Sequence, residues 1–289
     1  SIEFPFEVDS IFSMDNTPAF AGNFFRHIEI DREGYTWAGS NNHGLYRFNG
    51  NNWAPFPDNL FADHRVEDIA RDGKGEIWVG WLRLPSSRSE IGRVSHFSDT
   101  TFESVTHYNS LNDGLITRGV RSVDIAADGT VWSAHTQTLT GSNIDQGGVS
   151  WFDGTGWSTT RAGLPSGPYD KNATIVRVRG TLPWVNIPRS CNSGDCFDPY
   201  IAILNADGSL QSIVRGVQSQ APDFGVPEET VALEGIDGPN PDAKAILHDS
   251  RGSTWIGFAS GGGLAVKTGP AAAWMDAGVY ITEFDGFSV

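Results

Sequence analysis

Short apolar runs alternate with polar turns along the whole chain, and one such pattern returns five times. It reads HIEIDREGYTWAGS at 27–40, DIARDGKGEIWVGW at 68–81, SVDIAADGTVWSAH at 122–135 and AILHDSRGSTWIGF at 245–258. A weaker copy, TIVRVRGTLPWVNI at 174–187, keeps the aliphatic spacing and the tryptophan. In each copy an aliphatic run and a tryptophan run flank a turn that contains Asp or Gly, which predicts a pair of antiparallel strands.

A second pattern follows these pairs and predicts two further strands in each repeat. It reads GLYRFNGNNWAPF from residue 44, GRVSHFSDTTFESV from 92, GGVSWFDGTGWSTT from 147 and GVYITEFDGFSV from 278. The fourth strand is expected to open on Trp53, Phe102 or Trp157. Because four antiparallel strands repeated around a centre form the blade of a β-propeller, the sequence predicts an all-β propeller.

The number of tryptophan runs predicts five blades in a single domain that covers residues 1–289. The tryptophans that mark the blades are Trp37, Trp78, Trp132, Trp184 and Trp255. The expected blades cover residues 20–60, 61–110, 115–162, 170–215 and 240–289. Residues 1–10 are expected to close the last blade, with Phe287 to Val289 as the alternative closing strand. Six or seven blades remain an alternative, because the weak fourth copy leaves room for a sheet within residues 200–240.

Insertions lengthen several repeats beyond a bare blade. They fall at residues 82–91, 136–147, 187–199 and about 214–242. Three of them directly follow the tryptophan strand and therefore join the second and third strands of a blade. Insertions that gather on one face usually mark the working face of a repeat protein.

The spacing V..I..D..G..W.G, followed by GL.RF.G..W, resembles the two-component regulator propeller repeat. Such repeats occur in the extracytoplasmic sensor regions of bacterial hybrid histidine kinases and in related secreted proteins. More loosely, the chain is similar to propellers of the streptogramin-lyase type. The resemblance covers nearly the whole chain and implies a propeller fold with a sensor-type role. In the sensors the arrays are longer and continue into a membrane span and a kinase.

Charge and composition exclude some partners. The 289 residues carry a formal net charge of -15 at pH 7. An acidic surface repels phosphate groups, so neither nucleic acid nor an anionic membrane surface is an expected partner. No apolar run approaches the roughly 20 residues of a membrane-spanning helix, and membrane insertion is not predicted.

Two cysteines stand close together in the stretch CNSGDC. Cys191 and Cys196 flank a short Gly-containing loop, which favours a local disulfide and an extracytoplasmic location: secreted, periplasmic or on the cell surface. Two free thiols are the alternative. A zinc site is disfavoured because no second Cys or His pair stands at ligand spacing, so neither a metal nor a cofactor is predicted.

Aligning the repeats on tryptophan brings together a set of candidate ligand-binding residues. Eleven positions before each tryptophan stand Arg26, Glu67, Arg121, Ala173 and Lys244. The loops after the tryptophan strands, together with one further cation, add Asn42, His43, Arg65, Trp81, Arg83, His135 and Asn186. Arginine, amide and aromatic groups suit a carboxylate- or sulfate-bearing sugar. The alternative role for the cations is ion pairing with Glu67, Asp68 and Asp124, and the aligned tryptophans are expected to be packing residues.

Three functions are compatible with these residues. We favour a binding module, of sensor or adhesion type, for a glycan or another small anionic ligand. The second is a polysaccharide lyase or related carbohydrate enzyme, in which Arg neutralises a uronate carboxylate while His43 or His135 abstracts a proton. The third is a structural subunit whose propeller faces bind a protein partner. The sequence does not decide whether the protein is an enzyme.

Overall fold

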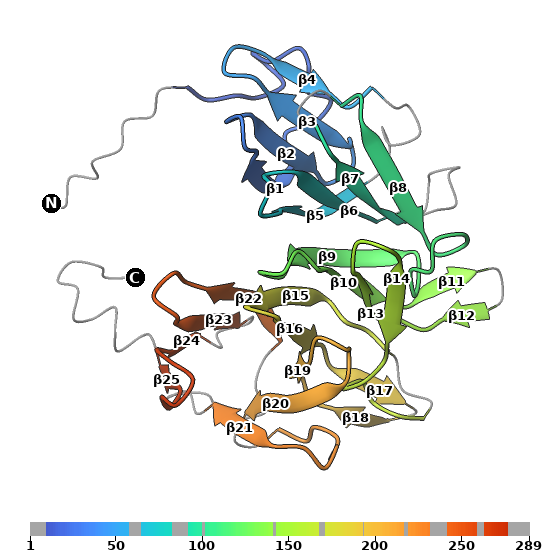
Figure 1. The fold of residues 1–289 in the computed structure, drawn as a ribbon, viewed down its shortest axis with the longest axis vertical. Helices are drawn as coiled ribbons and strands as arrows, with labels where there is room; N and C mark the ends of the chain where they lie inside the picture. The colour runs from blue at the N-terminus through green and yellow to red at the C-terminus, as the bar shows by residue number, and fades with distance from the viewer. Residues whose placement is uncertain are drawn as a thin grey trace, which may run out of the picture.

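The computed structural model is all-β in the part of the chain that it describes. This part comprises residues 10–57, 65–82, 92–99, 102–140, 143–167, 171–192, 194–216, 219–231, 242–258 and 263–276. Its regular elements are the strands β1 to β25 (Figure 1). Within these residues no helix is long and apolar enough to cross a membrane.

The strands group into four-stranded antiparallel meanders, which we number as units 1 to 5. Unit 1 holds β1 (Phe25–Ile30), β2 (Thr36–Ser40), β3 (Leu45–Phe48) and β4 (Trp53–Pro55). Unit 2 holds β5 (Arg65–Arg71), β6 (Ile77–Leu82), β7 (Arg93–Phe97) and β8 (Val105–Asn109). Unit 3 holds β9 (Gly119–Ile125), β10 (Val131–Thr136), β13 (Gly148–Phe152) and β14 (Trp157–Thr160). A single bridge between Leu82 and Gly119 joins units 2 and 3 into one eight-stranded sheet.

Units 4 and 5 follow the same plan. Unit 4 holds β15 (Ile175–Arg179), β16 (Leu182–Ile187), β19 (Tyr200–Leu204) and β20 (Leu210–Gly216), and β21 (Glu228–Val231) is added parallel to β20. Unit 5 holds β22 (Ala243–His248), β23 (Thr254–Phe258), β24 (Leu264–Lys267) and β25 (Met275–Asp276). In residues 200–216 and 219–231 the strands all belong to unit 4, so these residues form no separate sixth sheet.

The structure corrects two strand predictions. The second half of unit 5 lies at GLAVKTGPAAAWM, residues 263–275, and the predicted copy that begins at residue 278 lies outside the described residues. The fourth strand of unit 2 begins at Val105, because Phe102 has a φ of 68°, in the left-handed region that a strand does not use. The closing strands predicted at residues 1–10 and 287–289 are not within the described part of the chain.

A recurring aspartate shapes the turn between the first and second strands. Asp31 accepts hydrogen bonds from the backbone N–H groups of Glu33 and Tyr35 through Oδ1, at 2.9 and 3.0 Å. Its other oxygen accepts the indole N–H of Trp37 at 2.8 Å. Units 2 and 5 repeat both contacts with their own aspartate and tryptophan. The Asp–Gly–Trp spacing therefore encodes one turn in which the side chain replaces a backbone acceptor.

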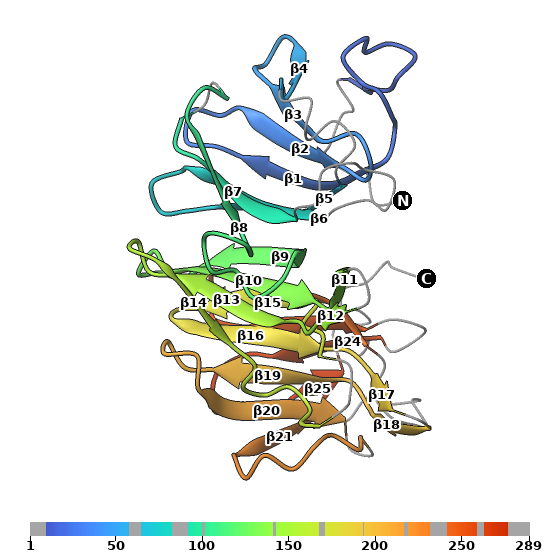
Figure 2. The ribbon, with the colours of Figure 1, turned by 90° about the vertical axis from the view of Figure 1, so that its right-hand side faces the viewer.

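The first strands of the units lie side by side through the centre of the molecule. β5 contacts β1 and β9, and β15 contacts β9 and β22 (Figures 1 and 2). The hydrophobic core lies between neighbouring units, where the tryptophan of one unit packs on the first strand of the next. Trp37 packs with Val66 and Ile69, and Trp132 packs with Val176. The predicted packing role of the aligned tryptophans is confirmed for the first four units.

The two ends of the unit series lack such a neighbour in the described residues. Ile28 of β1 is 66% exposed, whereas Ile69 at the same repeat position in β5 is 7% exposed. Trp255 of unit 5 is likewise only partly buried and belongs to none of the buried clusters. Burial at this position therefore depends on the adjacent unit and not on the residue itself.

Two insertions form hairpins at the predicted place between second and third strands. β11 (Thr138–Thr140) pairs with β12 (Asn143–Asp145), and β17 (Ser190–Asn192) pairs with β18 (Asp195–Phe197). Figure 2 shows both hairpins on the same side of the molecule. The second hairpin carries the Cys191–Cys196 disulfide, as the sequence predicted.

Candidate functional site

The first strands of all five units converge on one cavity of about 520 Å³. The residues that line it are Arg26 and His27 of β1, Glu67 and Asp68 of β5, Arg121 and Ser122 of β9, Thr174, Ile175 and Arg177 in and before β15, and Asp242 to Ile246 in and before β22. The start of β1 pairs with the end of β2, and the start of β9 pairs with the end of β10. The cavity therefore lies near the end of the strands at which the inserted hairpins leave the sheets.

A local irregularity places the residue eleven positions before the tryptophan at this cavity. In β1, β5, β9 and β22 the register with the second strand shifts by one residue. The extra residue of the resulting β-bulge is Arg26, Glu67, Arg121 or Lys244. The side chain of a bulged residue does not follow the regular alternation between the two faces of the sheet, so it points in a different direction from its neighbours. β15 has no shift, and Ala173 precedes it and is fully buried.

Asp68 connects four units beneath the cavity. Its Oδ2 accepts hydrogen bonds from Ser122 Oγ at 2.6 Å, Arg177 at 2.8 Å and the Val123 N–H at 3.1 Å. Its Oδ1 lies 3.1 Å from Nδ1 of His27. The contacts come from β1, β9 and β15, so a single carboxylate joins the first strands of units 1 to 4.

The charge state of this group follows from its partners. Burial alone would raise the pKa of Asp68, but the Arg177 guanidinium and the His27 ring hold it well below its usual range. Burial likewise opposes the charge of Arg177, while Asp68 and Asp124 raise its pKa above the ordinary value. Both shifts favour the charged forms, so Asp68 and Arg177 form an ion pair at neutral pH.

Glu67 is the second buried carboxylate, and it gathers three arginines. Arg121 donates to Glu67 at 3.2 Å, Arg65 pairs with the same carboxylate, and Arg26 approaches it at 3.9 Å. Burial lowers the pKa of Arg121, Glu67 raises it, and the charges of Arg65 and Arg26 lower it further. Three guanidinium groups around one carboxylate leave a local excess of positive charge in an acidic protein.

The cavity presents its cations to solvent and keeps most of its acids underneath. The side chains of Glu67 and Asp68 are each 4% exposed, whereas those of Arg26 and Arg121 are about a third exposed. Lys244 is mostly exposed and lies 3.6 Å from Asp242. An anion in the cavity would therefore meet guanidinium and ammonium groups before it met a carboxylate.

Some of the predicted site residues meet here, while His27, Ser122 and Arg177 were missed. Arg26, Arg121 and Lys244 line the cavity, and Arg65 adjoins it through Glu67. His27 and Ser122 each come directly after a bulged residue. Arg177 supplies the cation that unit 4 lacks at the repeat position eleven residues before its tryptophan. The expected ion pairs with Glu67 form at this cavity, from Arg26 and Arg121. Asp68 pairs with Arg177 instead, and Lys244 pairs with Asp242.

Other predicted residues lie elsewhere in the fold. His135 is fully buried in β10, with Nε2 2.8 Å from Ser133 Oγ and Nδ1 3.1 Å from the Thr117 carbonyl. Trp81 is also fully buried and donates its indole N–H to Ser95 Oγ at 2.9 Å. Neither lines the cavity, because the inward face of the second strand packs into the core.

The β2–β3 connection holds two more of these residues. The ring of His43 lies against the backbone of Gly22, and Asn42 is exposed. Neither is among the residues that line the central cavity. Arg83 lies outside the described residues.

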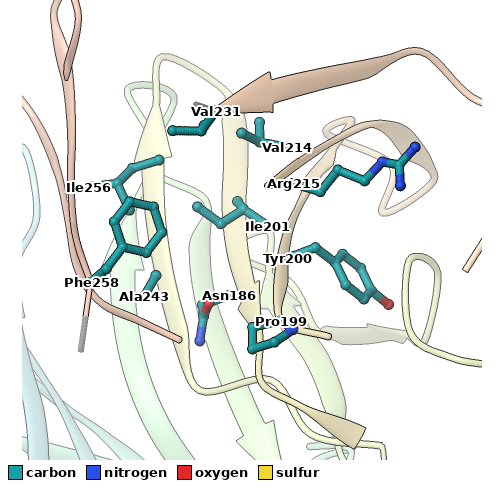
Figure 3. A pocket seen from close by; sticks show the side chains of 10 residues that line it. All are labelled: Asn186, Pro199, Tyr200, Ile201, Val214, Arg215, Val231, Ala243, Ile256 and Phe258. Carbon is teal, nitrogen blue, oxygen red and sulfur yellow. The ribbon is translucent and has the colours of Figure 1, made fainter. Parts of the chain in front are cut away.

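Asn186 lines a separate small pocket between units 4 and 5 (Figure 3). The pocket has a volume of about 10 Å³, close to the volume that one water molecule needs. Asn186 donates to Thr174 Oγ1 at 2.8 Å, while its Oδ1 is buried without a protein partner. The pocket suits a bound water rather than an organic ligand.

Acid is expected to destabilise the protein through His135. Burial lowers its pKa to about 3, while the unfolded chain takes up this proton near pH 6.5. The unfolded state therefore binds more protons between these pH values. The contribution of the uncharged His135 to the free energy of unfolding is complete above about pH 6.5. It declines as the pH falls towards 3, by a total on the order of a few kcal/mol. Urea unfolding at neutral pH and at about pH 4 measures this loss.

The matched variant is His135→Asn, which removes the titrating group. Its unfolding free energy should change less between the two pH values than that of the unsubstituted protein. His248, whose pKa burial lowers to about 4, acts in the same direction and accounts for part of the remaining slope. An unchanged slope in His135→Asn would show that His135 does not carry the effect.

Comparison with known proteins defines the class of fold. The chain matches no protein-family model, and no curated protein matches its sequence. Among solved structures, the extracellular domain of a hybrid two-component system from B. thetaiotaomicron is 15% identical, with a TM-score of 0.56 over 88% of this chain and 28% of that one. PorZ, a surface component of the type-IX secretion system of Porphyromonas gingivalis, is 16% identical, with a TM-score of 0.56 over 91% of this chain and 35% of that one.

Virginiamycin B lyase from Staphylococcus aureus is 11% identical, with a TM-score of 0.53 over 87% of this chain and 69% of that one. At these identities the likeness establishes the fold alone. The chain has the fold of sensor-type extracellular propeller domains. The sequence resemblance to two-component regulator propellers and, more loosely, to propellers of the streptogramin-lyase type is confirmed. It spans about a third or less of the sensor domain and of PorZ.

Proposed function

We propose that the protein is an extracytoplasmic module that binds a small anionic ligand in the central cavity. The substrate class we favour is a carboxylate- or sulfate-bearing sugar. In this proposal residues 1–289 form one five-bladed propeller whose blades follow units 1 to 5. The observation that carries it is the cavity of about 520 Å³, to which β1, β9 and β22 each contribute a cationic side chain that is at least partly exposed.

The N–H donors that the cavity arginines retain support the binding of an anion. Arg121 uses one terminal nitrogen on Glu67 and Nε on Thr136 Oγ1, at 3.2 and 3.4 Å. Arg26 uses one terminal nitrogen on Asn41 Oδ1 at 3.2 Å. Each guanidinium has five N–H donors, so both retain donors for a ligand carboxylate or sulfate.

Two further features support an extracytoplasmic setting and a binding role. The Cys191–Cys196 disulfide is typical of oxidising compartments. The lyase alternative places His43 or His135 beside the arginines, and neither of them lines the cavity. A binding module needs no general base, so it is the simpler function for these residues.

A ligand screen tests the proposal. We expect uronate-bearing or sulfated oligosaccharides to raise the unfolding temperature, with an effect that weakens as salt is added. Arg121→Gln should lower the affinity of a hit about tenfold or more, because it removes a charge-assisted hydrogen bond. Arg251→Gln, on the exposed β22–β23 turn, is the matched control and should bind normally.

Two results would contradict the proposal. One is a panel of anionic sugars that leaves the unfolding temperature unchanged, which would favour the protein-binding role. The other is a hit that Arg121→Gln binds as tightly as the unsubstituted protein, since the ligand would then bind elsewhere.

A further inference from the structure

A second cleft lies at the opposite end of the strands from the central cavity. Its volume is about 810 Å³, and it opens between the turns of units 2 and 3. The β5–β6 turn supplies Asp72 and Glu76, β7 supplies His96, and the turns of unit 3 supply Asp128 and Asp153. The cleft shares no lining residue with the central cavity.

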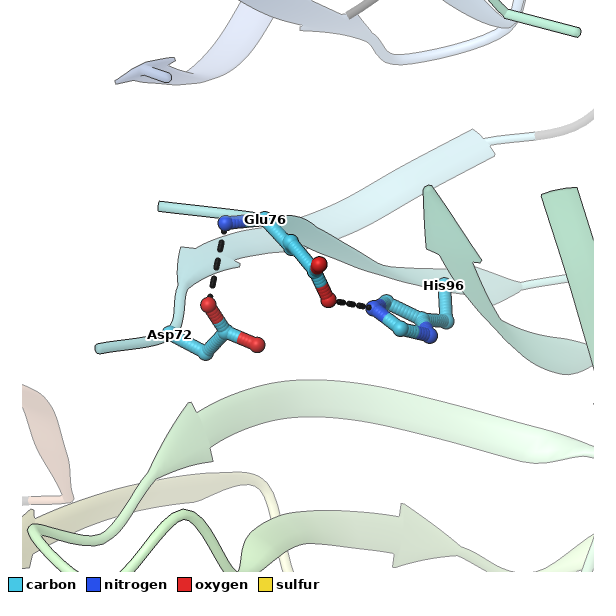
Figure 4. Close-up of side chains that lie close together, drawn as sticks. All are labelled: Asp72, Glu76 and His96. Carbon is cyan, nitrogen blue, oxygen red and sulfur yellow. Dashed lines mark hydrogen bonds and ion pairs between the residues drawn. The ribbon is translucent and has the colours of Figure 1, made fainter. Parts of the chain in front are cut away.

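Three side chains at this cleft bring metal-ligating atoms together (Figure 4). One donor atom from each of Asp72, Glu76 and His96 lies within 4.8 Å of the other two. Nε2 of His96 lies 2.8 Å from Oε2 of Glu76. The side chains of Glu76 and His96 are only 14% and 19% exposed. They are therefore less free to turn into solvent than polar side chains on the surface.

The repeat itself shows which of these residues the turn requires. Units 1 and 5 build the same turn with Asp31 and Asp249, so the structural role accounts for Asp72. At the position of Glu76 those units have Tyr35 and Ser253, and opposite their tryptophans they have Arg47 and Val266 instead of His96. The turn therefore forms without a carboxylate or an imidazole at these two places.

Asp72 and His96 are also arranged differently from their equivalents. The indole N–H of Trp78 lies 3.4 Å from Asp72 Oδ2, against 2.8 Å in unit 1 and 3.1 Å in unit 5, so this oxygen is the least engaged of the three. The His96 ring stacks on Trp78 with a centroid distance of 4.1 Å and an angle of 10°. Stacking fixes the plane of the ring, and Figure 4 shows its nitrogen facing Glu76.

We propose that Asp72, Glu76 and His96 bind a divalent transition-metal ion such as Zn²⁺. Two carboxylates and one imidazole are a donor set that suits zinc. Three protein donors leave a coordination position, and the cleft beside them has room for water or a ligand group there. Ligand bonds of about 2.0–2.2 Å place two donors of one tetrahedral ion about 3.4 Å apart. Nε2 of His96 and Oε2 of Glu76 are 2.8 Å apart, so the ion would replace their hydrogen bond through small rotations of the two side chains.

Some charged side chains around the site repel a bound cation and others attract it. Arg32 lies 3.9 Å from Glu76, and Arg71 and Lys74 line the same cleft, so these cations oppose the ion. Asp128 and Asp153 line the cleft as well and offset them. Zinc must also displace any proton on Nε2 of His96, together with the hydrogen bond between this nitrogen and Glu76.

Calorimetric titration of the metal-free full chain with ZnCl₂ tests the proposal. We expect one tight site in the unsubstituted protein and an affinity at least about tenfold lower in His96→Gln and in Glu76→Gln. Asp128→Asn removes one charge from the same cleft and should change the affinity by less than about threefold. Circular dichroism and the unfolding temperature establish that each variant is folded, and Glu76→Gln serves if His96→Gln is not.

Cobalt gives an independent readout. Co²⁺ bound at the site should produce visible absorption bands that His96→Gln abolishes. The proposal is overturned if no zinc binds at millimolar concentration, if both variants bind as tightly as the unsubstituted protein, or if Asp128→Asn weakens binding as much as His96→Gln. None of these results depends on a ligand in the central cavity.

Discussion

Asp68→Ala is expected to lower the free energy of unfolding by about 3–5 kcal/mol. The substitution removes the buried partner of Arg177, whose own side chain is 30% exposed, and breaking an ion pair that is buried on one side carries a penalty of up to about this size. It also removes the acceptor of the Val123 N–H and one of the two acceptors of Ser122 Oγ, and so breaks hydrogen bonds that link the first strands of units 2 and 3. Urea unfolding followed by tryptophan fluorescence gives the difference.

Two comparisons distinguish the loss of the Asp68–Arg177 ion pair from a general loss of stability on substitution of cavity residues. Asp242→Ala removes a carboxylate that is partly exposed and 3.6 Å from Lys244, and its cost should stay below about 1 kcal/mol. The double variant Asp68→Leu with Arg177→Met removes both charges and should be more stable than Asp68→Ala. If the double variant were as unstable as the sum of its single variants, the buried ion pair would not be the cause.

Trp37→Ala is expected to cost about 3–5 kcal/mol as well, by a different mechanism. Trp37 is fully buried between units 1 and 2, with Phe97 and Phe102 at ring-centroid distances of 5.1 and 5.0 Å. Its removal leaves a cavity among these rings and leaves Asp31 Oδ2 without the indole donor. Thermal and urea unfolding both measure the loss.

Trp255→Ala is the control that the repeat provides. Trp255 holds the same repeat position and makes the same bond to its aspartate, at 3.1 Å, but it is only partly buried. Its replacement should cost clearly less than that of Trp37. Equal losses would indicate that the turn bond, and not packing on the next unit, determines the contribution of these tryptophans.

The tryptophan spacing was sufficient to predict the four-stranded units because the same position serves two purposes in the repeat. The tryptophan fills the core towards the next unit in units 1 to 4, and it donates to the turn aspartate in units 1, 2 and 5. The second half of unit 5 was misplaced because β24 and β25 have no aromatic alternation. Lys267 there is buried, and it pairs with Glu229 at 2.6 Å, a contact from 38 residues away that a local pattern cannot contain.

The candidate site was only partly predictable. Alignment on the tryptophans found Arg26, Arg121 and Lys244, since they share one repeat position. It did not find Arg177, because β15 lacks the bulge and supplies its cation from a different position. His135 was predicted at the site and His27 was not, since the sequence alone does not reveal that His135 points into the core while His27 faces Asp68.

The bulges also bear on how such a protein could change its ligand during evolution. An extra residue stands outside the alternation that fills the core, so replacing it alters the cavity without shifting the buried side chains on either side of it. The four bulged positions already hold three different residue types on the same scaffold. Selection could therefore recombine charges at these positions, one unit at a time, while the cores between the units stay intact.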